Sequence, residues 1–364
     1  MPATSTRIFN FSAGPAVMPE PVLERIRDDV WDIDGSGIGV LEHSHRGPVI
    51  DRVFDEAIDR CRRLAGLGDE HEILFLQGGA SMQFGMIPMN FLPGDATADY
   101  PDTGTWTTKA IKEARKFGNV NVAFDGSACG YDHCPSADEL KTTADAAYFH
   151  YCSNNTIYGT RYATPPVSDA PLVCDASSEM FGRPWNHADH ALVYAGAQKN
   201  LGPSGVALVI IRKDMLERSC RETIDLLDYR KHAAQGSRLN TPPVFGVYCM
   251  GLVFEWILGM GGLEGIATHN AAKAKTIYDA IDGSGGFYRG HAAPGSRSEM
   301  NVTFRLPEES LEKTFVSEAK AAGMDGLKGH RSVGGIRASI YNAFPPAGCE
   351  ALASFMSDFA SRNG

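Results

Sequence analysis

The chain has 364 residues, of which 44 are acidic and 34 are basic, so its formal net charge is −10 at pH 7. This acidic balance argues against non-specific nucleic-acid binding, which depends on Lys and Arg neutralising phosphates. With 43% apolar and 21% charged residues, the composition is globular rather than disordered, and no apolar run reaches the length of a membrane span.

Eight cysteines are scattered along the chain without any Cys-x-x-Cys pair. Cys174 lies inside an apolar run, where a free thiol behaves as a small hydrophobe. Reduced thiols of this kind are typical of cytoplasmic proteins, and the N-terminal residues lack the charged and apolar regions of a secretion signal. We therefore expect a cytoplasmic protein with no nucleic-acid partner, no membrane and no metal site.

An N-terminal arm precedes two helices, predicted over 20–31 and 48–67 from the spacing of their apolar residues. Strand-like runs then alternate with helical patterns. The expected strands lie at 72–79, 97–104, 119–126, 146–154, 170–177, 190–198 and 204–212, and intervening helices are expected over 81–91 and 106–117. This alternation predicts an α/β layer structure around a mostly parallel sheet.

The run at 204–212 follows the short turn Gly202-Pro203-Ser204-Gly205, so we expect it to return antiparallel to the strand before it. A helix at 243–258 and a glycine-containing break at 259–262 come next. The remaining pattern, with helices over 263–282 and 310–322, two strands and a final helix, predicts a smaller α+β unit. We expect a large domain over 17–259 and a small domain made of 1–16 and 260–364.

Lys199 is the only charged residue in the stretch VYAGAQKNLGPSGVALVI. A loop lysine usually extends its head into water. Here, however, the residue follows a predicted buried strand, at the sheet edge where open α/β sheets bind ligands. Partial burial would also lower the pKa of the amine, and only the neutral amine forms a Schiff base.

Asp175 ends the apolar run PLVCD. Such an aspartate can simply cap the next turn, or it can keep a pyridine nitrogen protonated. A Schiff-base lysine and an aspartate partner together are the pair expected in a pyridoxal phosphate (PLP) site.

Two softer signals agree with that chemistry. Gly78 and Gly79 follow a strand and precede a helix, where backbone N–H groups can bind phosphate, although a Gly-Gly pair is more often only a turn. Trp106, at a predicted helix start, can be a packing residue or can stack on a flat ring.

Seven blocks of the sequence resemble phosphoserine aminotransferases, which are fold-type I, PLP-dependent enzymes of the class V aminotransferase group. The blocks are NFSAGPAVMP, EHSHRG, TADYPDTGTW, HYCSNNTIYGT, YAGAQKNLGPSG, LNTPPVF and LKGHRSVGGIRASIYNA, and the likeness extends from about Ile8 to the C-terminus. The resemblance implies an α/β fold with a mostly parallel seven-stranded sheet in the large domain and a smaller C-terminal α+β domain. It also implies a homodimer with shared active sites.

The resemblance also assigns roles around PLP. Lys199 would be the Schiff-base lysine, Asp175 would pair with the ring nitrogen, Trp106 would stack on the ring, and Thr156 would bond near its hydroxyl group. Ala80, Ser81 and Gln198 would hold the phosphate. Asn240 and Thr241 would reach that phosphate from the partner subunit.

Basic residues supply the substrate pocket in this resemblance. Surface salt bridges are the ordinary role of His-Arg pairs, but His330, Arg331 and Arg337 lie among glycines with few acidic neighbours. By resemblance, Arg337 would bind the α-carboxylate. The distal phosphate or γ-carboxylate would be bound by His330 and Arg331 together with His45 and Arg46, the last two arriving from the partner.

The expected reaction transfers the amino group of L-glutamate to 3-phosphohydroxypyruvate, giving O-phospho-L-serine and 2-oxoglutarate, a step of serine biosynthesis. A vitamin B6 biosynthesis step on a related phosphorylated keto acid stays open. So do another class V PLP enzyme, such as an alanine–glyoxylate type aminotransferase or a sulfur-mobilising lyase, and a non-catalytic phosphate-binding protein. Two positions depart from relatives in this resemblance: many relatives have Ser where this chain has Ala13, and some have Arg where it has Ser81, a variant that also occurs in the family.

Overall fold

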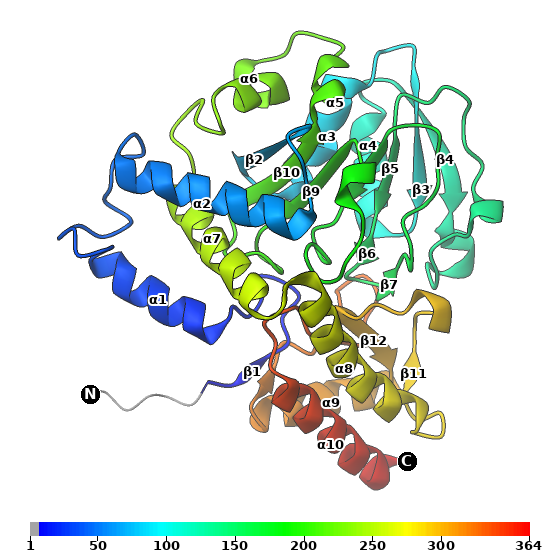
Figure 1. The fold of residues 1–364 in the computed structure, drawn as a ribbon. Coiled ribbons are helices and arrows are strands. Elements are labelled where there is room, and N and C mark those ends of the chain that lie inside the picture. Colours follow the sequence, from blue (N-terminus) through cyan, green and yellow to red (C-terminus); the bar gives the residue numbers. More distant parts are fainter. Residues whose placement is uncertain (1–6) are drawn as a thin grey trace.

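The computed structural model describes residues 7–364 and has a seven-stranded sheet at its centre (Figure 1). The strand order is β2-β10-β9-β8-β5-β3-β4. The strands are β2 (His71–Gln77), β3 (Thr97–Asp102), β4 (Asn119–Asp125), β5 (Phe149–Cys152), β8 (Leu172–Asp175), β9 (Leu192–Gly196) and β10 (Val206–Arg212). Only β10 runs against its neighbours among these seven, so the expected antiparallel return after the Gly202–Gly205 turn is confirmed.

Helices cover both faces of this sheet. Successive side chains of a strand point to opposite faces, and in β2 Ile73 and Phe75 join one apolar cluster while Leu74 and Leu76 join the other. The first cluster includes α2 (Pro48–Ala65) and α7 (Val244–Gly259), and the second includes α3 (Ala80–Phe91) and α4 (Thr105–Ala114). The α/β layer structure predicted from alternating segments is therefore confirmed.

The C-terminal part of the chain forms a separate apolar cluster below the sheet in Figure 1. Its sheet has the order β11-β12-β14, and its helices pack on that sheet. The elements are α8 (Gly262–Asp282), β11 (Arg289–Gly290), β12 (Asn301–Arg305), α9 (Glu309–Ala321), β13 (Met324–Asp325), β14 (Ile336–Ser339) and α10 (Pro346–Asn363). This arrangement is the smaller α+β unit that the sequence predicts.

The N-terminal arm joins that unit rather than the large sheet, because β1 (Phe9–Asn10) pairs in parallel with β13. Residues 1–6 of the predicted arm lie outside the described residues. The strand pairing favours a division into a large domain (17–259) and a small domain (1–16 and 260–364), and the exact edges stay a prediction.

The remaining elements are short or lie at the periphery. They are α1 (Glu20–Trp31), β6 (Asn154–Asn155), β7 (Thr160–Arg161), α5 (Lys213–Glu217) and α6 (Tyr229–Ala234). Several predicted elements were too long. The helix expected over 48–67 ends at Ala65, because Gly66 takes the left-handed conformation (φ 65°) that terminates a helix.

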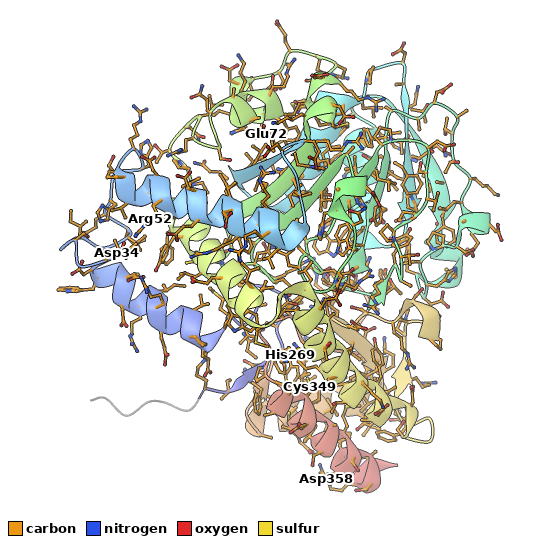
Figure 2. The ribbon with its side chains drawn as sticks, in the orientation of Figure 1. Asp34, Arg52, Glu72, His269, Cys349 and Asp358 are labelled. Atoms are coloured by element: carbon orange, nitrogen blue, oxygen red, sulfur yellow. The ribbon has the colours of Figure 1, made fainter. Side chains whose placement is uncertain are left out.

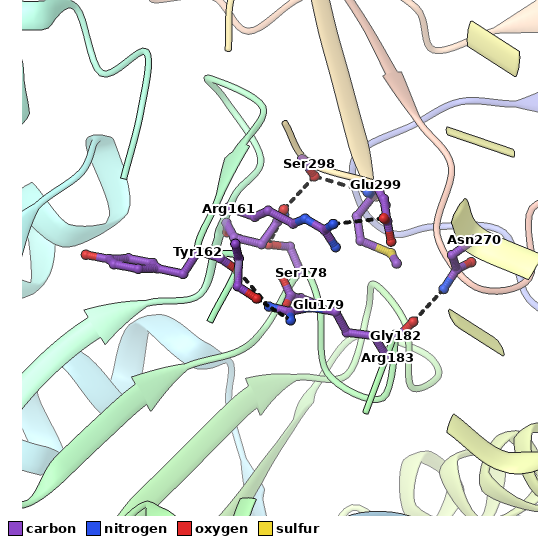
Figure 3. Close-up of polar contacts among 12 residues, drawn as sticks. Arg161, Tyr162, Ser178, Glu179, Gly182, Arg183, Asn270, Ser298 and Glu299 are labelled. Carbon is purple, nitrogen blue, oxygen red and sulfur yellow. Dashed lines mark hydrogen bonds and ion pairs between the residues drawn. The ribbon is translucent and has the colours of Figure 1, made fainter. Parts of the chain in front are cut away.

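Polar contacts join the large sheet to the C-terminal unit (Figure 3). Arg161 Nη2 donates to Glu299 Oε1 at 2.8 Å, and Asn270 Nδ2 donates to the Gly182 carbonyl at 2.9 Å. In addition, Asn154 Nδ2 donates to Asn301 Oδ1 at 2.9 Å. Buried polar groups are costly unless paired, so these bonds fix how the segment 154–161 lies against β12.

Within residues 7–364, no single helix has both the length and the apolar composition needed to span a membrane. The helices α7 and α8 meet those criteria only as a joined pair, with a bend of 83° at the break between them.

Gly159 lies where the segment 154–161 approaches β12 closely. Its φ is +71°, and a Cβ there would lie 2.5 Å from Thr303 Oγ1 and 2.8 Å from the Asn301 carbonyl. We expect Gly159→Ala to lower the free energy of unfolding by about 2–5 kcal/mol, from left-handed strain plus overpacking. Denaturant titration of the protein at fixed concentration measures this loss.

The matched control is Gly130→Ala, which has the same backbone strain (φ +65°) but nothing within 4 Å of the new methyl group. Its expected cost is only about 1–2 kcal/mol. Equal losses for the two variants would contradict a steric role for the Gly159 approach.

Candidate active site

Lys199 lies in the turn that connects β9 to β10. The carbonyl of Ala197 fixes this turn by accepting hydrogen bonds from the backbone N–H groups of Leu201 (3.1 Å) and Gly202 (2.8 Å). The adjacent Asn200 is buried, and its Nδ2 donates to the Met180 carbonyl at 3.1 Å. The lysine is thus held on a rigid turn at the carboxyl edge of the sheet, as the sequence predicts.

The Lys199 side chain is half-buried, and its surroundings change the pKa of its amine. Burial lowers its pKa from the usual 10.5, and the Asp175 carboxylate opposes that change by favouring the ammonium form. Arg337 is close enough to add to the lowering. A lysine in this setting releases its proton more readily than a solvated one, which suits a nucleophile or a base.

Asp175 ends β8 and is only 5% exposed. Burial raises the pKa of its carboxyl, while Lys199 and then Ser177 act in the opposite direction. Ser177 donates to Asp175 Oδ1 twice, from its backbone N (3.0 Å) and from its hydroxyl (2.6 Å). Both bonds go to Oδ1, so Ser177 does not occupy the second oxygen, which can accept from a protonated ring nitrogen.

A buried tyrosine and histidine lie behind Asp175. Tyr194 is the register partner of Asp175 in the adjacent parallel strand, so their side chains share a face of the sheet. Its hydroxyl is hydrogen-bonded to His150 Nε2 at 2.9 Å. Burial lowers the pKa of His150 to about 3, so the ring is neutral and adds no charge to the site.

Trp106 is the second residue of α4 and lies beside these groups. Its Nε1 donates to Thr156 Oγ1 at 2.9 Å, and Lys199 Nζ lies 5.6 Å from the centre of its ring. Gly104 (φ +141°) precedes the helix, because a side chain there would meet Asn155 and Tyr158. Asn155 Nδ2 in turn donates to the Thr103 carbonyl at 3.2 Å. The 154–159 segment and the start of α4 thus hold the indole and Thr156 together.

The N-terminus of α3 is open at the same sheet edge. No side chain among the described residues caps it, and its first turn contains no acidic residue. The first N–H groups of a helix have no partner inside the helix, so the amides around Ala80 and Ser81 can receive a phosphate. The half-buried Gln198, next to Lys199, has its carbonyl bound by the Ala16 N–H at 2.8 Å.

Arg337 extends from β14 toward this region. Its Nη1 donates to the Thr156 carbonyl at 3.1 Å, whereas its buried Nε has no hydrogen-bond partner within the described residues. Burial lowers the pKa of the guanidinium, and no carboxylate in residues 7–364 forms a salt bridge with it. An unpartnered buried donor of this kind is expensive unless a ligand completes it.

His330 and Arg331 lie in the loop before β14. His330 Nδ1 is hydrogen-bonded to Ser332 Oγ at 2.7 Å, and Arg331 is exposed. Burial lowers the pKa of His330, and Arg337, Arg331 and Lys109 lower it further because they are nearby cations. These positive groups therefore gather on one side of the site.

The other predicted residues do not reach Lys199 in a single chain. His45 and Arg46 lie in the connection between α1 and α2, at the left of Figure 1 and well apart from α4 and β6. Asn240 and Thr241 make no hydrogen bond to Ala80 or Ser81 within residues 7–364, and the Thr241 carbonyl accepts instead from the Gln77 side chain. Their roles in the partner's site stay predictions.

Three residues near Asp175 and Trp106 are assigned to the site from the structure and not from the sequence. Ser177 holds Asp175, Tyr194 lies beside it, and Lys109 has its Nζ 4.7 Å from the centre of the Trp106 ring. Lys109 could have been found from its i+3 spacing to Trp106. The Tyr194 contact depends on the register of β8 and β9, which no local pattern gives.

The residues present fit PLP. The α3 N-terminus offers amides for a phosphate, Trp106 offers a ring face, and Asp175 keeps an oxygen free for a ring nitrogen. The lysine that would form the Schiff base lies beside that aspartate.

Comparison with known proteins decides the family. The family model "Aminotransferase class-V" matches residues 8–352. The chain belongs to the class-V aminotransferases. This aminotransferase is 51% identical over 358 residues to phosphoserine aminotransferase of Herpetosiphon aurantiacus, an alignment that covers 98% of this chain and 99% of the relative.

Solved structures of relatives agree with the fold of the aminotransferase. The phosphoserine aminotransferase from Bacillus circulans subsp. alkalophilus is 48% identical, with a TM-score of 0.96 and coverage of 98% of this chain and 99% of that one. The PLP-bound phosphoserine aminotransferase from Trichomonas vaginalis is 38% identical, with a TM-score of 0.91 and coverage of 96% and 100%. The aminotransferase is accordingly a PLP-dependent, fold-type I enzyme.

A second group of ligand-type side chains lies away from this site. Potential ligand atoms of Cys129, Asp132 and His133 lie within 4.8 Å of one another. Both ring nitrogens of His133 already contact carboxylates, Asp132 at 2.7 Å and Glu139 at 3.2 Å. Those contacts raise the pKa of His133, and they leave neither ring nitrogen unoccupied for an ion.

The lowered pKa of Lys199 predicts how the apoenzyme captures its cofactor. Only the neutral amine reacts, so the rate of PLP capture rises as the pH passes through the pKa of Lys199. Because that pKa lies below 10.5, we expect the midpoint at a lower pH than for the side chain of Nα-acetyl-lysine. Stopped-flow absorbance of the apoenzyme mixed with PLP measures it. A midpoint at or above that of the free amine would contradict the burial effect, and Lys199→Ala is the blank.

Proposed function

We propose that this aminotransferase transfers the amino group of L-glutamate to 3-phosphohydroxypyruvate, giving O-phospho-L-serine and 2-oxoglutarate. The observation that carries the proposal is the set of positive groups without carboxylate partners beside Lys199. Arg337 keeps a buried Nε–H free, and Arg331 forms no salt bridge within residues 7–364. A substrate with an anion at each end needs cations at both ends of its pocket. Full-length relatives named phosphoserine aminotransferase support the same substrate.

Side chains of this protein would each have a separate role in the transfer reaction. Bound PLP supplies an aldehyde that links covalently to an amine and a protonated ring that withdraws electrons from Cα. Asp175, with Oδ1 held by Ser177, would keep that ring protonated through its free oxygen. Lys199 Nζ would take the proton from Cα of glutamate and return a proton to Cα of the keto acid in the second half-reaction. Trp106 would cover the ring and exclude water.

Arg337 would orient both substrates by their α-carboxylates. A guanidinium binds a carboxylate with two parallel N–H···O bonds, and one of the two donors required, Nε, is unpartnered in the described residues. His330 and Arg331 would then bind the distal phosphate or the γ-carboxylate. One pocket serves the two substrates in turn, so ping-pong kinetics are expected.

Substrate selectivity tests the function. In coupled assays with L-glutamate, the enzyme should use 3-phosphohydroxypyruvate at least about a hundredfold more efficiently than hydroxypyruvate, since charge-assisted contacts to the phosphate are absent with the latter. Arg331→Ala should lower kcat/KM for the phosphorylated acid about tenfold or more and leave hydroxypyruvate nearly unchanged. No preference for the phosphorylated acid would refute the proposed substrate.

Other activities on this scaffold are less well supported. A sulfur-mobilising lyase needs a mobile, reactive cysteine, but Cys349 is fully buried within the C-terminal unit, where Figure 2 labels it, and burial raises the pKa of its thiol to about 12. An alanine–glyoxylate type enzyme has no use for a distal cationic group. A vitamin B6 biosynthesis step on another phosphorylated keto acid remains compatible with the same pocket. All eight cysteines are free thiols, which supports a cytoplasmic location.

We further propose a homodimer with shared active sites. Val30, Trp31, Ile38 and Leu41 are exposed on α1 and the connection after it, with Trp31 at 86%. Exposed apolar side chains that gather on one surface favour association. His45 and Arg46 follow on the same connection between α1 and α2, which lies apart from α4 and β6 in Figure 1. A partner copy would bring these two residues to the other site and cover the apolar surface.

Mixed dimers test this sharing. Lys199→Ala and Arg46→Ala homodimers should both be nearly inactive with 3-phosphohydroxypyruvate. If Arg46 acts in the partner's site, refolding the two variants together creates one intact site per mixed dimer and restores about a quarter of wild-type activity. No recovery, with mixed dimers present by native mass spectrometry, would place Arg46 outside the shared site.

A further inference from the structure

Lys109 lies on α4, three residues after Trp106. Its Nζ is 4.7 Å from the centre of the Trp106 ring, and Lys199 Nζ is 5.6 Å from the same centre. Trp106 is half-buried and Lys109 is exposed, so Lys109 lies at the rim of the site. An aromatic face attracts a cation, so this ring holds the Lys109 ammonium beside the site, where it can attract an anion.

Nothing in residues 7–364 neutralises Lys109. The residue forms no salt bridge there. Glu113 is placed at i+4, where a helix normally pairs a lysine with a carboxylate, but Glu113 is bound to Lys116 at 2.5 Å. The Lys109 side chain lies instead over Trp106, toward the N-terminus of the helix and the substrate side.

A chain of contacts connects Lys109 to the residues proposed to bind substrate. Trp106, beneath Lys109, donates to Thr156 Oγ1 at 2.9 Å, and Arg337 donates to the Thr156 carbonyl at 3.1 Å. Lys109 also lies near enough to His330 to lower the pKa of that imidazole, as do Arg337 and Arg331. Lys109 thus belongs with Arg331 and Arg337 to the cations near His330. It comes from α4, which packs on the large sheet, whereas Arg331 comes from the loop before β14.

We propose that Lys109 is a specificity-determining residue that binds the distal phosphate of the keto-acid substrate together with His330 and Arg331. This inference rests on the proposed function, since it concerns the same pocket. A phosphate has more negative charge and more acceptor oxygens than a γ-carboxylate. An ammonium group at the rim, added to the Arg331 guanidinium, therefore favours the phosphorylated acid over glutamate and over unphosphorylated keto acids. The competing interpretation is a lysine that only covers the indole.

Steady-state kinetics of the holoenzyme variants Lys109→Ala and Lys109→Arg test the proposal. We expect Lys109→Ala to lower kcat/KM for 3-phosphohydroxypyruvate about tenfold, mostly through a higher KM, since one charge-assisted contact is lost. Hydroxypyruvate should change by less than about twofold, and Lys109→Arg should keep most of the wild-type value because its charge remains.

A binding measurement gives a readout besides turnover. 3-Phosphoglycerate has a carboxylate and a distal phosphate but no keto group, so the holoenzyme can bind it without reacting. Calorimetry should show about tenfold weaker binding to Lys109→Ala than to wild type. Because exposed charges are screened by salt, this difference should shrink at high ionic strength.

Lys112→Ala is the matched control. Lys112 is exposed on the same helix and forms no salt bridge within residues 7–364, and it is not among the cations that lower the pKa of His330. It should leave both substrates and 3-phosphoglycerate unaffected. Thermal melting of all variants checks that the fold is kept, and Lys109→Gln replaces Lys109→Ala if the latter is unstable.

The outcomes separate the two proposals. If wild type prefers the phosphorylated acid and Lys109→Ala keeps that preference unchanged, Lys109 does not bind phosphate and the inference is overturned. Equal losses with both keto acids would also overturn it, because they indicate a role in holding Trp106. If wild type itself shows no preference, the proposed function fails, and the inference fails with it.

Discussion

The pairing of a half-buried lysine with a buried aspartate is the constraint on which the site depends. Burial favours the neutral forms of both groups, whereas their mutual attraction favours the charged forms. The balance leaves Lys199 with a lowered pKa and Asp175 with a raised one. Such a pair is stable only when its geometry is fixed, and two strand ends and the turn at Ala197 fix it here.

The site also requires that the seven-stranded sheet and the C-terminal unit hold a fixed position relative to each other. Lys199 and Asp175 belong to the seven-stranded sheet, whereas Arg337 belongs to β14 of the C-terminal unit. Their relation is set by the segment 154–161, whose residues bond to β12 and to Arg337 through Thr156. Gly159 lets that segment approach β12 more closely than any side chain would allow. The polar junction in Figure 3 therefore belongs to the geometry of the site as much as the strands do.

Charge distribution separates the site from the rest of the surface. Elsewhere many arginines and lysines pair with carboxylates, as Arg297 does with Asp282 at 2.7 Å and Lys275 with Asp279 at 2.5 Å. Around Lys199, the cations Arg337, Arg331 and Lys109 have no such partner within the described residues. In a chain with net charge −10, a local excess of positive groups is costly unless an anionic ligand uses it.

The sequence by itself determined the layers, the antiparallel β10 of the seven-stranded sheet, Asp175 at a strand end and Lys199 in the turn after a strand, because apolar periodicity and turn residues act over short distances. It also identified the class V family from blocks spread along the chain. It did not reveal that Ser177 holds Asp175, although that contact spans only two residues. It also did not reveal that Tyr194 lies beside that carboxylate or that Lys109 lies near His330. The last two contacts depend on strand register and on how the C-terminal unit docks, and the tertiary structure decides both. They join separate segments of the chain, and no local pattern encodes the distance between them.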